Sequence, residues 1–127
     1  MIVLTVFFFG CVEKQSDEKV VFELEAQKLI ESYHNDKEAS DVKYLNKVLT
    51  VRGITQSVVV KNGYISSIII GTENEKSGVV STFFSRDRPK EGAVVPGEEI
   101  KVRGLCSGIL YDVLLTNSEL LNKNLAQ

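Results

Sequence analysis

Few side chains in this sequence could carry out chemistry, and they lie far apart along the chain. The sequence has one histidine, His34, and two cysteines, Cys11 and Cys106. A serine–histidine–aspartate triad would have to use His34, and one histidine cannot build a two-histidine zinc motif. The sequence contains no glycine-rich phosphate loop and no dinucleotide fingerprint. We therefore expect no catalytic residue, no metal site and no cofactor, and we interpret His34 as a solvated surface residue.

Cys11 stands where a lipid could be attached. Residues 1–10 (MIVLTVFFFG) are free of charge, Gly10 is small, and the chain becomes polar directly after the cysteine. This order is typical of the end of a bacterial lipoprotein signal, although the usual cationic start is missing. A transmembrane helix would need about 20 apolar residues. We expect cleavage before Cys11, lipidation of Cys11 and a polar tether over residues 11–19; a buried N-terminal strand is the alternative.

A second group of residues combines aromatic rings with positive charge. Arg86, Arg88 and Lys90 follow the pair Phe83 and Phe84. Stacking on rings beside basic side chains is how single-stranded nucleic acids are held. In a strand one ring of the pair faces the core, so one ring only could stack on a ligand. A packed ring beside a solvated charged loop is the alternative interpretation.

Composition limits the class of protein and of partner. The chain has 127 residues, enough for one domain, with 43% hydrophobic and 25% charged residues as in soluble globular proteins. Its 15 basic and 17 acidic residues give a net charge of −2. Nucleic-acid-binding domains usually carry a basic excess, because neutralising phosphates supplies much of their affinity. We therefore expect a protein, peptide or glycan ligand, and consider nucleic acid unfavoured.

The elements that would position these residues begin with helices. An apolar stripe predicts a first helix capped by Ser16 or Asp17; its members are Phe22, Ala26, Leu29, Ile30 and Tyr33. The stripe fails after Tyr33. Asn35 and Glu38 have capping-box spacing, which predicts a second short helix over about 36–44 that buries Ala39 and Val42.

From residue 47 the pattern is that of strands. The first, over 47–60, contains Gly53, where we expect a bulge or bend. Asn62-Gly63 predicts a type I′ hairpin turn leading to a second strand over 64–70. Further strands are predicted over 79–85, 99–110 and 111–120, with the acidic segment Glu73 to Glu75 in a solvated loop and a Pro96-Gly97 turn. Alternation places Cys106 on a buried face, as a free thiol.

Five short strands that follow one another closely predict a small closed barrel, since closure removes exposed edges. The expected fold is therefore mainly β (α+β): a five-stranded OB-fold barrel over residues 20–127, with one or two N-terminal helices covering one mouth. An SH3-like barrel is the alternative. In an OB-fold, strands two and three and their flanking loops usually hold the ligand. The candidate ligand-binding surface is then Tyr64, Phe83, Phe84, Arg86, Arg88 and Lys90.

The stretches YLNKVLTVRGI and PGEEIKVRGLCSGILYDVLLTNSEL (44–54 and 96–120) resemble the tRNA-anticodon-like OB-fold family of bacterial envelope lipoproteins. The matching positions are Asn35, Ala39, Tyr44, Lys47, Val51, Gly53, Gly97, Lys101, Gly104, Cys106, Gly108, Asp112 and Val113. The resemblance covers about 26–120 and implies an OB-fold and an envelope location, without a settled activity. Members often carry a second cysteine where this chain has Thr82, so the resemblance implies no disulfide to Cys106 here.

Two hypotheses of function follow. The first is a non-catalytic binding module, anchored by lipid to the cell envelope and facing the periplasm or the cell exterior. The alternative is a cytoplasmic OB-fold protein that binds single-stranded nucleic acid; the basic segment Arg86 to Lys90 supports it, while the acidic net charge and the signal-like N-terminus count against it.

Overall fold

The computed structural model describes residues 22–71 and 77–122. The expected signal segment 1–10, the tether 11–19 with Cys11, and the loop residues Glu73 to Glu75 lie outside these ranges. The elements in chain order are β1 (Phe22–Glu25), α2 (Ala26–Asn35), α3 (Lys37–Tyr44), β2 (Val48–Lys61), β3 (Tyr64–Gly71), β4 (Val79–Phe83), the 3-10 turn η3 (Ser85–Asp87), β5 (Glu99–Ile109) and β6 (Val113–Asn122).

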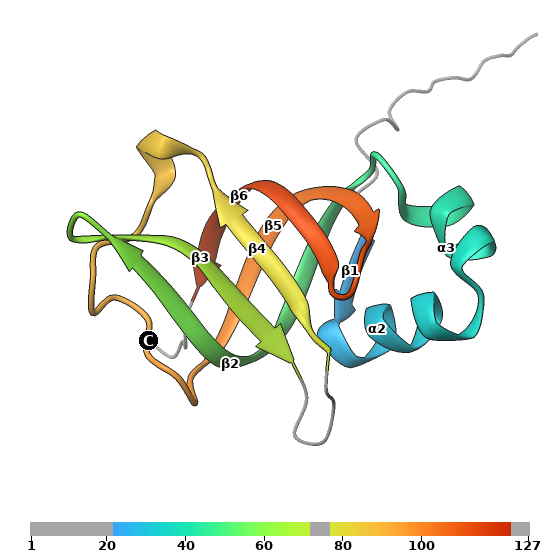
Figure 1. Ribbon diagram of the computed structural model, residues 1–127, viewed down its shortest axis with the longest axis horizontal. Helices are drawn as coiled ribbons and strands as arrows, with labels where there is room; N and C mark the ends of the chain where they lie inside the picture. Colours follow the sequence, from blue (N-terminus) through green and yellow to red (C-terminus); the bar gives the residue numbers. More distant parts are fainter. Residues whose placement is uncertain (1–21, 72–76, 123–127) are drawn as a thin grey trace, which may run out of the picture.

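Five strands close into a barrel with the connectivity of an OB-fold. The strand order is β2-β3-β4-β6-β5, and β5 pairs again with the first half of β2 (Figure 1). β4 and β6 run parallel, while the other barrel pairs are antiparallel. The expected OB-fold is confirmed, and the SH3-like alternative is set aside.

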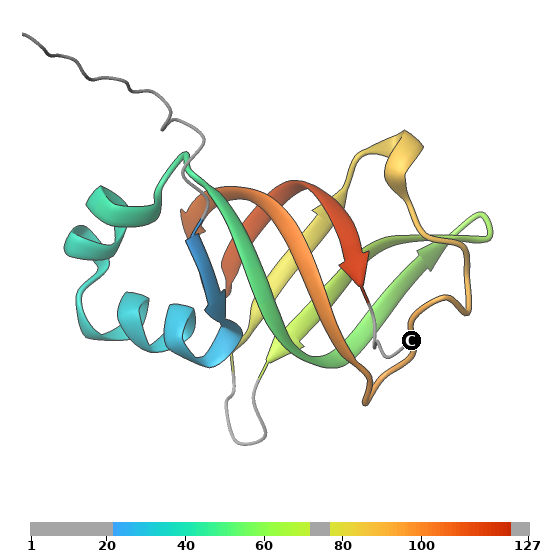
Figure 2. The same ribbon diagram turned by 180° about the vertical axis from the view of Figure 1, so that it is seen from behind.

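The barrel is filled from every strand and from one helix. Leu49, Ile68, Val79, Val102 and Leu115, one residue from each strand, are fully buried. The helix α2 adds an apolar stripe to the same core, made of Ala26, Leu29, Ile30 and Tyr33. As expected, the helices cover one mouth of the barrel (Figure 2).

The start of the first helix differs from the expectation. Phe22 lies in the short strand β1, which pairs in parallel with β2 from Phe22↔Leu49 to Glu25↔Arg52. The helix begins only at Ala26, with Glu25 at its N-cap, so capping by Ser16 or Asp17 is wrong. Phe22 and Leu24 are half-buried between exposed glutamates, which is the two-residue period of a strand. This segment pairs with a free edge of β2, so the helix starts only after it.

The second helix is present, but its faces are not those expected. The N-cap is Asp36, whose carboxylate accepts a hydrogen bond from the Ala39 amide at 3.0 Å, rather than Asn35. Ser40 and Tyr44 are buried, whereas Ala39 and Val42 are exposed. The one-residue shift of the cap, together with the change in helix direction at Asp36, turns the expected apolar face toward water.

The long strand β2 is bent, but Gly53 is not its bulge. The register shifts in its pairing with β3 fall between Thr55 and Ser57 and between Val59 and Val60. The Asn62-Gly63 hairpin is confirmed, since both residues have positive φ, at 55° and 83°. The third strand ends at Phe83, before η3 begins at Ser85, and the last begins at Val113, each two residues short of the expected boundary.

The barrel has two different ends. The helices, β1 and the turn between β5 and β6 lie at one, which we call the helical end. The β2–β3 hairpin and η3 lie at the other, which we call the hairpin end (Figures 1 and 2). Both the expected ligand-binding residues and the entry of the chain into the domain can be placed relative to these ends.

Candidate functional site at the hairpin end

The long connection between β4 and β5 is held against the β2–β3 hairpin. Tyr64 and Lys90 form an isolated antiparallel bridge. The amide of Ile65 donates to the carbonyl of Pro89 at 2.7 Å, and that of Glu91 donates to the carbonyl of Gly63 at 3.0 Å. Two predicted site residues, Tyr64 and Lys90, are therefore neighbours although they are far apart in sequence.

The aromatic pair divides as the strand pattern predicts. Phe83 is buried in the core, so its place in the candidate ligand-binding surface is wrong, because its ring points into the barrel. Phe84 is 45% exposed, and the Arg86 guanidinium lies over its ring at 5.8 Å from the centroid. Ser67 of β3 pairs with Thr82 of β4, which brings the end of β4 to the same side of the barrel as the start of β3.

Three cations accompany these rings. Arg86 and Lys90 are exposed, whereas Arg88 is half-buried and its Nε, shielded from solvent, has no hydrogen-bond partner among the described residues. Within residues 22–71 and 77–122, none of the three forms an ion pair, whereas Arg52 of β2 and Lys101 and Arg103 of β5 do. We call Tyr64, Phe84, Arg86, Arg88 and Lys90 the aromatic–basic surface. Asp87 and Glu91 lie in the same segment and reduce its charge.

Between the two ends, the outer face of β3 and β4 is uncharged. Ser67, Ile69 and Val80 are half-buried and Thr82 is exposed, while the alternate positions Ile68, Ile70 and Ser81 are buried. Ser67↔Thr82 and Ile69↔Val80 are paired across the two strands. A ligand lying on this face would contact small polar and apolar side chains. The positively charged side chains of the protein would contact it only at the hairpin end.

Sequence reasoning missed two exposed residues at the opposite end. Leu110 is 82% and Tyr111 is 67% exposed, in the turn between β5 and β6. The strand pattern includes Tyr111 in the last strand, whereas β6 begins only at Val113 and leaves Tyr111 in the turn. The signal was Gly108, whose φ of 93° ends the regular pairing of the strand just before these residues.

His34 contacts a serine without forming a triad. The exposed His34 lies at the end of α2, with its Nε2 3.2 Å from Ser77 Oγ. Among the described residues, no hydrogen bond joins His34 to a carboxylate that could orient it. In the same part of the chain, no group of three or more His, Cys, Asp or Glu side chains has the arrangement of a metal site. Nor is any helix there long and apolar enough to cross a bilayer.

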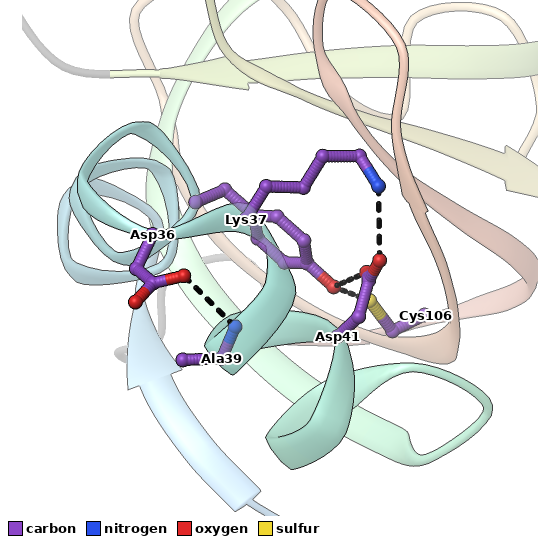
Figure 3. Close-up of polar contacts among 6 residues, drawn as sticks. Asp36, Lys37, Ala39, Asp41 and Cys106 are labelled. Atoms are coloured by element: carbon purple, nitrogen blue, oxygen red, sulfur yellow. Dashed lines mark hydrogen bonds and ion pairs between the residues drawn. The ribbon is translucent and has the colours of Figure 1, made fainter.

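Cys106 is buried, as predicted, and lies in a small polar cluster at the helical end. The hydroxyl of Tyr33 donates to Asp41 Oδ1 at 2.9 Å and lies 3.6 Å from Cys106 Sγ, and Lys37 Nζ lies 3.0 Å from Asp41 Oδ2 (Figure 3). Burial, followed by the contacts with Cys106 and Asp41, raises the pKa of Tyr33 well above its ordinary value. Tyr33 therefore stays protonated as a donor, and the cluster joins α2, α3 and β5.

This cluster makes part of the stability depend on acid pH. Hydrogen bonds from Lys37 first, then from Tyr33, lower the pKa of Asp41 in the folded chain. The unfolded value is about 3.9, so the stabilisation is present above about pH 4 and is lost as the pH falls through the folded pKa. We expect Asp41→Asn to flatten the acid limb of a plot of urea midpoint against pH. A limb of unchanged slope would show that Asp41 does not contribute to it.

Comparisons with known proteins agree with this fold. A family model described as tRNA_anti-like matches residues 6–120. Among solved structures, one similar chain is from Klebsiella pneumoniae and is described as a proposed nucleic acid-binding lipoprotein. It is 16% identical, with a TM-score of 0.60, and the match covers 87% of this chain and 100% of that chain. At that identity the likeness shows the fold. No curated protein matches the chain.

Proposed function

Because this chain belongs to the tRNA_anti-like family and forms an OB-fold barrel, we propose that it is a non-catalytic binding module. Lipid on Cys11 tethers it to the bacterial envelope, and the aromatic–basic surface and the adjoining face of β3 and β4 hold the ligand. The ligand class we favour is an extended acidic protein, peptide or glycan chain. The solved lipoprotein from Klebsiella pneumoniae with a similar fold supports the tether.

One observation carries the binding role. An exposed ring, Phe84, lies under the Arg86 guanidinium at a site where, among the described residues, neither Arg86 nor Lys90 is neutralised by an ion pair. A ring and cations that are exposed together can stack on a planar group and pair with an anion without breaking an ion pair within the protein. This combination lies beside β3, where OB-folds hold ligands.

Single-stranded nucleic acid is the second candidate ligand. The description of the Klebsiella protein favours it, as does the pairing of aromatic rings with arginines. The net charge of −2 and the acidic Asp87 and Glu91 within the basic segment weigh against it. Fluorescence anisotropy with a labelled decaglutamate and a labelled ten-nucleotide thymidine strand, each at two salt concentrations, separates the two candidates.

Lipidation of Cys11 is tested by mass and by fractionation. In cells that express the full chain, we expect the membrane fraction to contain a form that has lost residues 1–10 and gained the mass of a diacylglycerol. Globomycin, which blocks the lipoprotein signal peptidase, should cause the uncleaved form to accumulate. The Cys11→Ser protein should leave the membrane fraction.

The matched control for this prediction is folding. Residues 12–21 separate Cys11 from β1, the first described element, so Cys11→Ser should leave the melting temperature unchanged. A soluble wild-type protein that keeps residues 1–10 would contradict the tether. Unchanged membrane partition of the Cys11→Ser protein would contradict lipidation at that cysteine.

A further inference from the structure

The helical end of the barrel carries an apolar surface of its own. Leu110 is 82%, Tyr111 is 67% and Val42 is 82% exposed. Single exposed apolar residues are ordinary on soluble proteins. Here two large apolar side chains are adjacent at a turn, and a third lies at the same end. Contact of this surface with water costs free energy unless a partner covers it.

The turn that presents Leu110 and Tyr111 is held in place. The amide of Leu110 donates to the carbonyl of Asp112 at 3.1 Å. The Asp112 carboxylate accepts from the amide of Gly78 at 2.8 Å, and the amide of Val113 donates to the carbonyl of Gly78 at 3.0 Å. The two side chains are therefore projected from a turn anchored to the start of β4.

The helix α3 lies beside this turn. A Cβ on Gly108, which precedes the turn, would lie 3.5 Å from Leu45 Cδ1 and 3.8 Å from Asp41 Oδ1. Asp41 and Leu45 flank Val42 along the chain, so Val42 belongs to the same end of the barrel. The aromatic–basic surface lies at the opposite, hairpin end (Figure 1).

The chain enters the domain at this apolar end. Phe22 pairs with Leu49 near the start of β2 and packs edge-on against Tyr44 of α3, with ring centroids 5.4 Å apart. Residues 12–21 separate Phe22 from Cys11. Fully extended, that stretch of chain spans about 35 Å. A lipid on Cys11 would thus keep the helical end within this distance of the bilayer.

We propose that the helical end docks on the lipid bilayer, with Leu110 and Tyr111 entering the headgroup region and the aromatic–basic surface directed away from it. The inference rests on the proposed lipid anchor. Tyrosine favours the membrane–water interface, where its ring is buried and its hydroxyl stays hydrated.

The charges around the turn indicate that docking is apolar rather than electrostatic. Along α3 and its flanks, three lysines (Lys37, Lys43 and Lys47) balance three carboxylates (Asp36, Glu38 and Asp41), and Asp112 of the turn adds one negative charge, so these residues have no basic excess. Docking through this end should therefore depend little on anionic lipid or salt, unlike attachment through a basic patch.

The test uses the absence of tryptophan from the sequence. Tyr111→Trp places a single fluorophore at the turn, and Phe84→Trp places one at the hairpin end as the matched control. Each full-length protein is extracted from the membrane fraction and reconstituted into phosphatidylethanolamine–phosphatidylglycerol vesicles containing brominated acyl chains. Circular dichroism melts confirm that both variants fold like the wild type.

We expect the bromolipids to quench the Tyr111→Trp fluorophore and aqueous iodide to quench the Phe84→Trp fluorophore, at low and at high salt. Adding Leu110→Asp to the Tyr111→Trp protein should abolish lipid quenching, because a carboxylate is costly at that depth. A protein that floats with vesicles but shows equal iodide quenching at both positions overturns docking and leaves the anchor standing. If neither bromolipid nor iodide quenches the Tyr111→Trp fluorophore, a protein rather than the bilayer covers this end, and docking on the bilayer is overturned. A chain that does not float overturns the anchor and the docking together.

Discussion

The double variant Arg86→Glu with Lys90→Glu should lose binding to an acidic ligand while folding normally. Both side chains are exposed, and within the described ranges neither is paired with a carboxylate, so reversal removes attraction without breaking an ion pair. It does remove the contact of the Arg86 guanidinium with the exposed Phe84 ring, which lies at the surface and outside the core. A charge-assisted contact contributes about 1.5 kcal/mol, so losing two weakens binding about 100-fold. Fluorescence anisotropy of a labelled decaglutamate measures the loss.

Arg88 is left in place in this variant for a structural reason. It is half-buried, and its Nε is shielded from solvent, so a glutamate there would place a carboxylate in a partly desolvated position. The matched control is Lys28→Glu with Lys47→Glu, which makes the same change in net charge at exposed positions of the helical end. Equal loss of binding in both double variants would show that net charge alone, and not the aromatic–basic surface, attracts the ligand.

Phe84 separates the two candidate ligands in the same assay. Phe84→Leu keeps an apolar side chain but removes the ring on which a base or sugar stacks, and base stacking contributes roughly 1–3 kcal/mol per base. A large loss with the thymidine strand and a small one with decaglutamate would favour nucleic acid. If Phe84→Leu has little effect and binding is lost only in the variant with Arg86→Glu and Lys90→Glu, an acidic chain is favoured.

The barrel could be predicted from sequence because its signals are local. Asn62-Gly63 specifies a turn, and β-branched runs on either side specify the strands that the turn joins. The burial of Cys106 follows from alternation along one strand. These features depend on a few neighbouring residues, and the structure has each of them.

The N-terminal region could not be predicted in the same way, because its conformation depends on a distant partner. The segment from Phe22 to Glu25 reads as part of a helical stripe until β2 offers an unpaired edge. Whether Val42 faces the core or water depends on the direction that the chain takes at Asp36, and no local pattern sets that direction. The apolar turn at Leu110 and Tyr111 was missed for a related reason, since its exposure depends on where β5 stops pairing.

Gly53 shows a second limit of the sequence pattern, and its substitution should have a large effect on stability. A glycine within a strand predicts a bulge, yet the register shifts lie further along β2. A Cβ on Gly53 would lie 2.6 Å from Ile70 Cγ2 and 3.0 Å from Ala26 Cβ, both side chains of the buried core. The glycine is therefore needed because α2 and β3 approach the backbone closely at this point.

We accordingly expect Gly53→Ala to lower the free energy of unfolding by about 1–3 kcal/mol, as overpacking usually does, and Gly53→Val to lower it further. Urea denaturation measures both. Ile70→Ala alone should cost about 2–5 kcal/mol through the cavity that it leaves. In the Gly53→Ala background, however, it removes the atom that the new methyl group meets, so the double variant should be more stable than the sum of the two losses predicts. Strictly additive losses, or equal effects of alanine and valine at Gly53, would mean that backbone freedom rather than close packing requires the glycine.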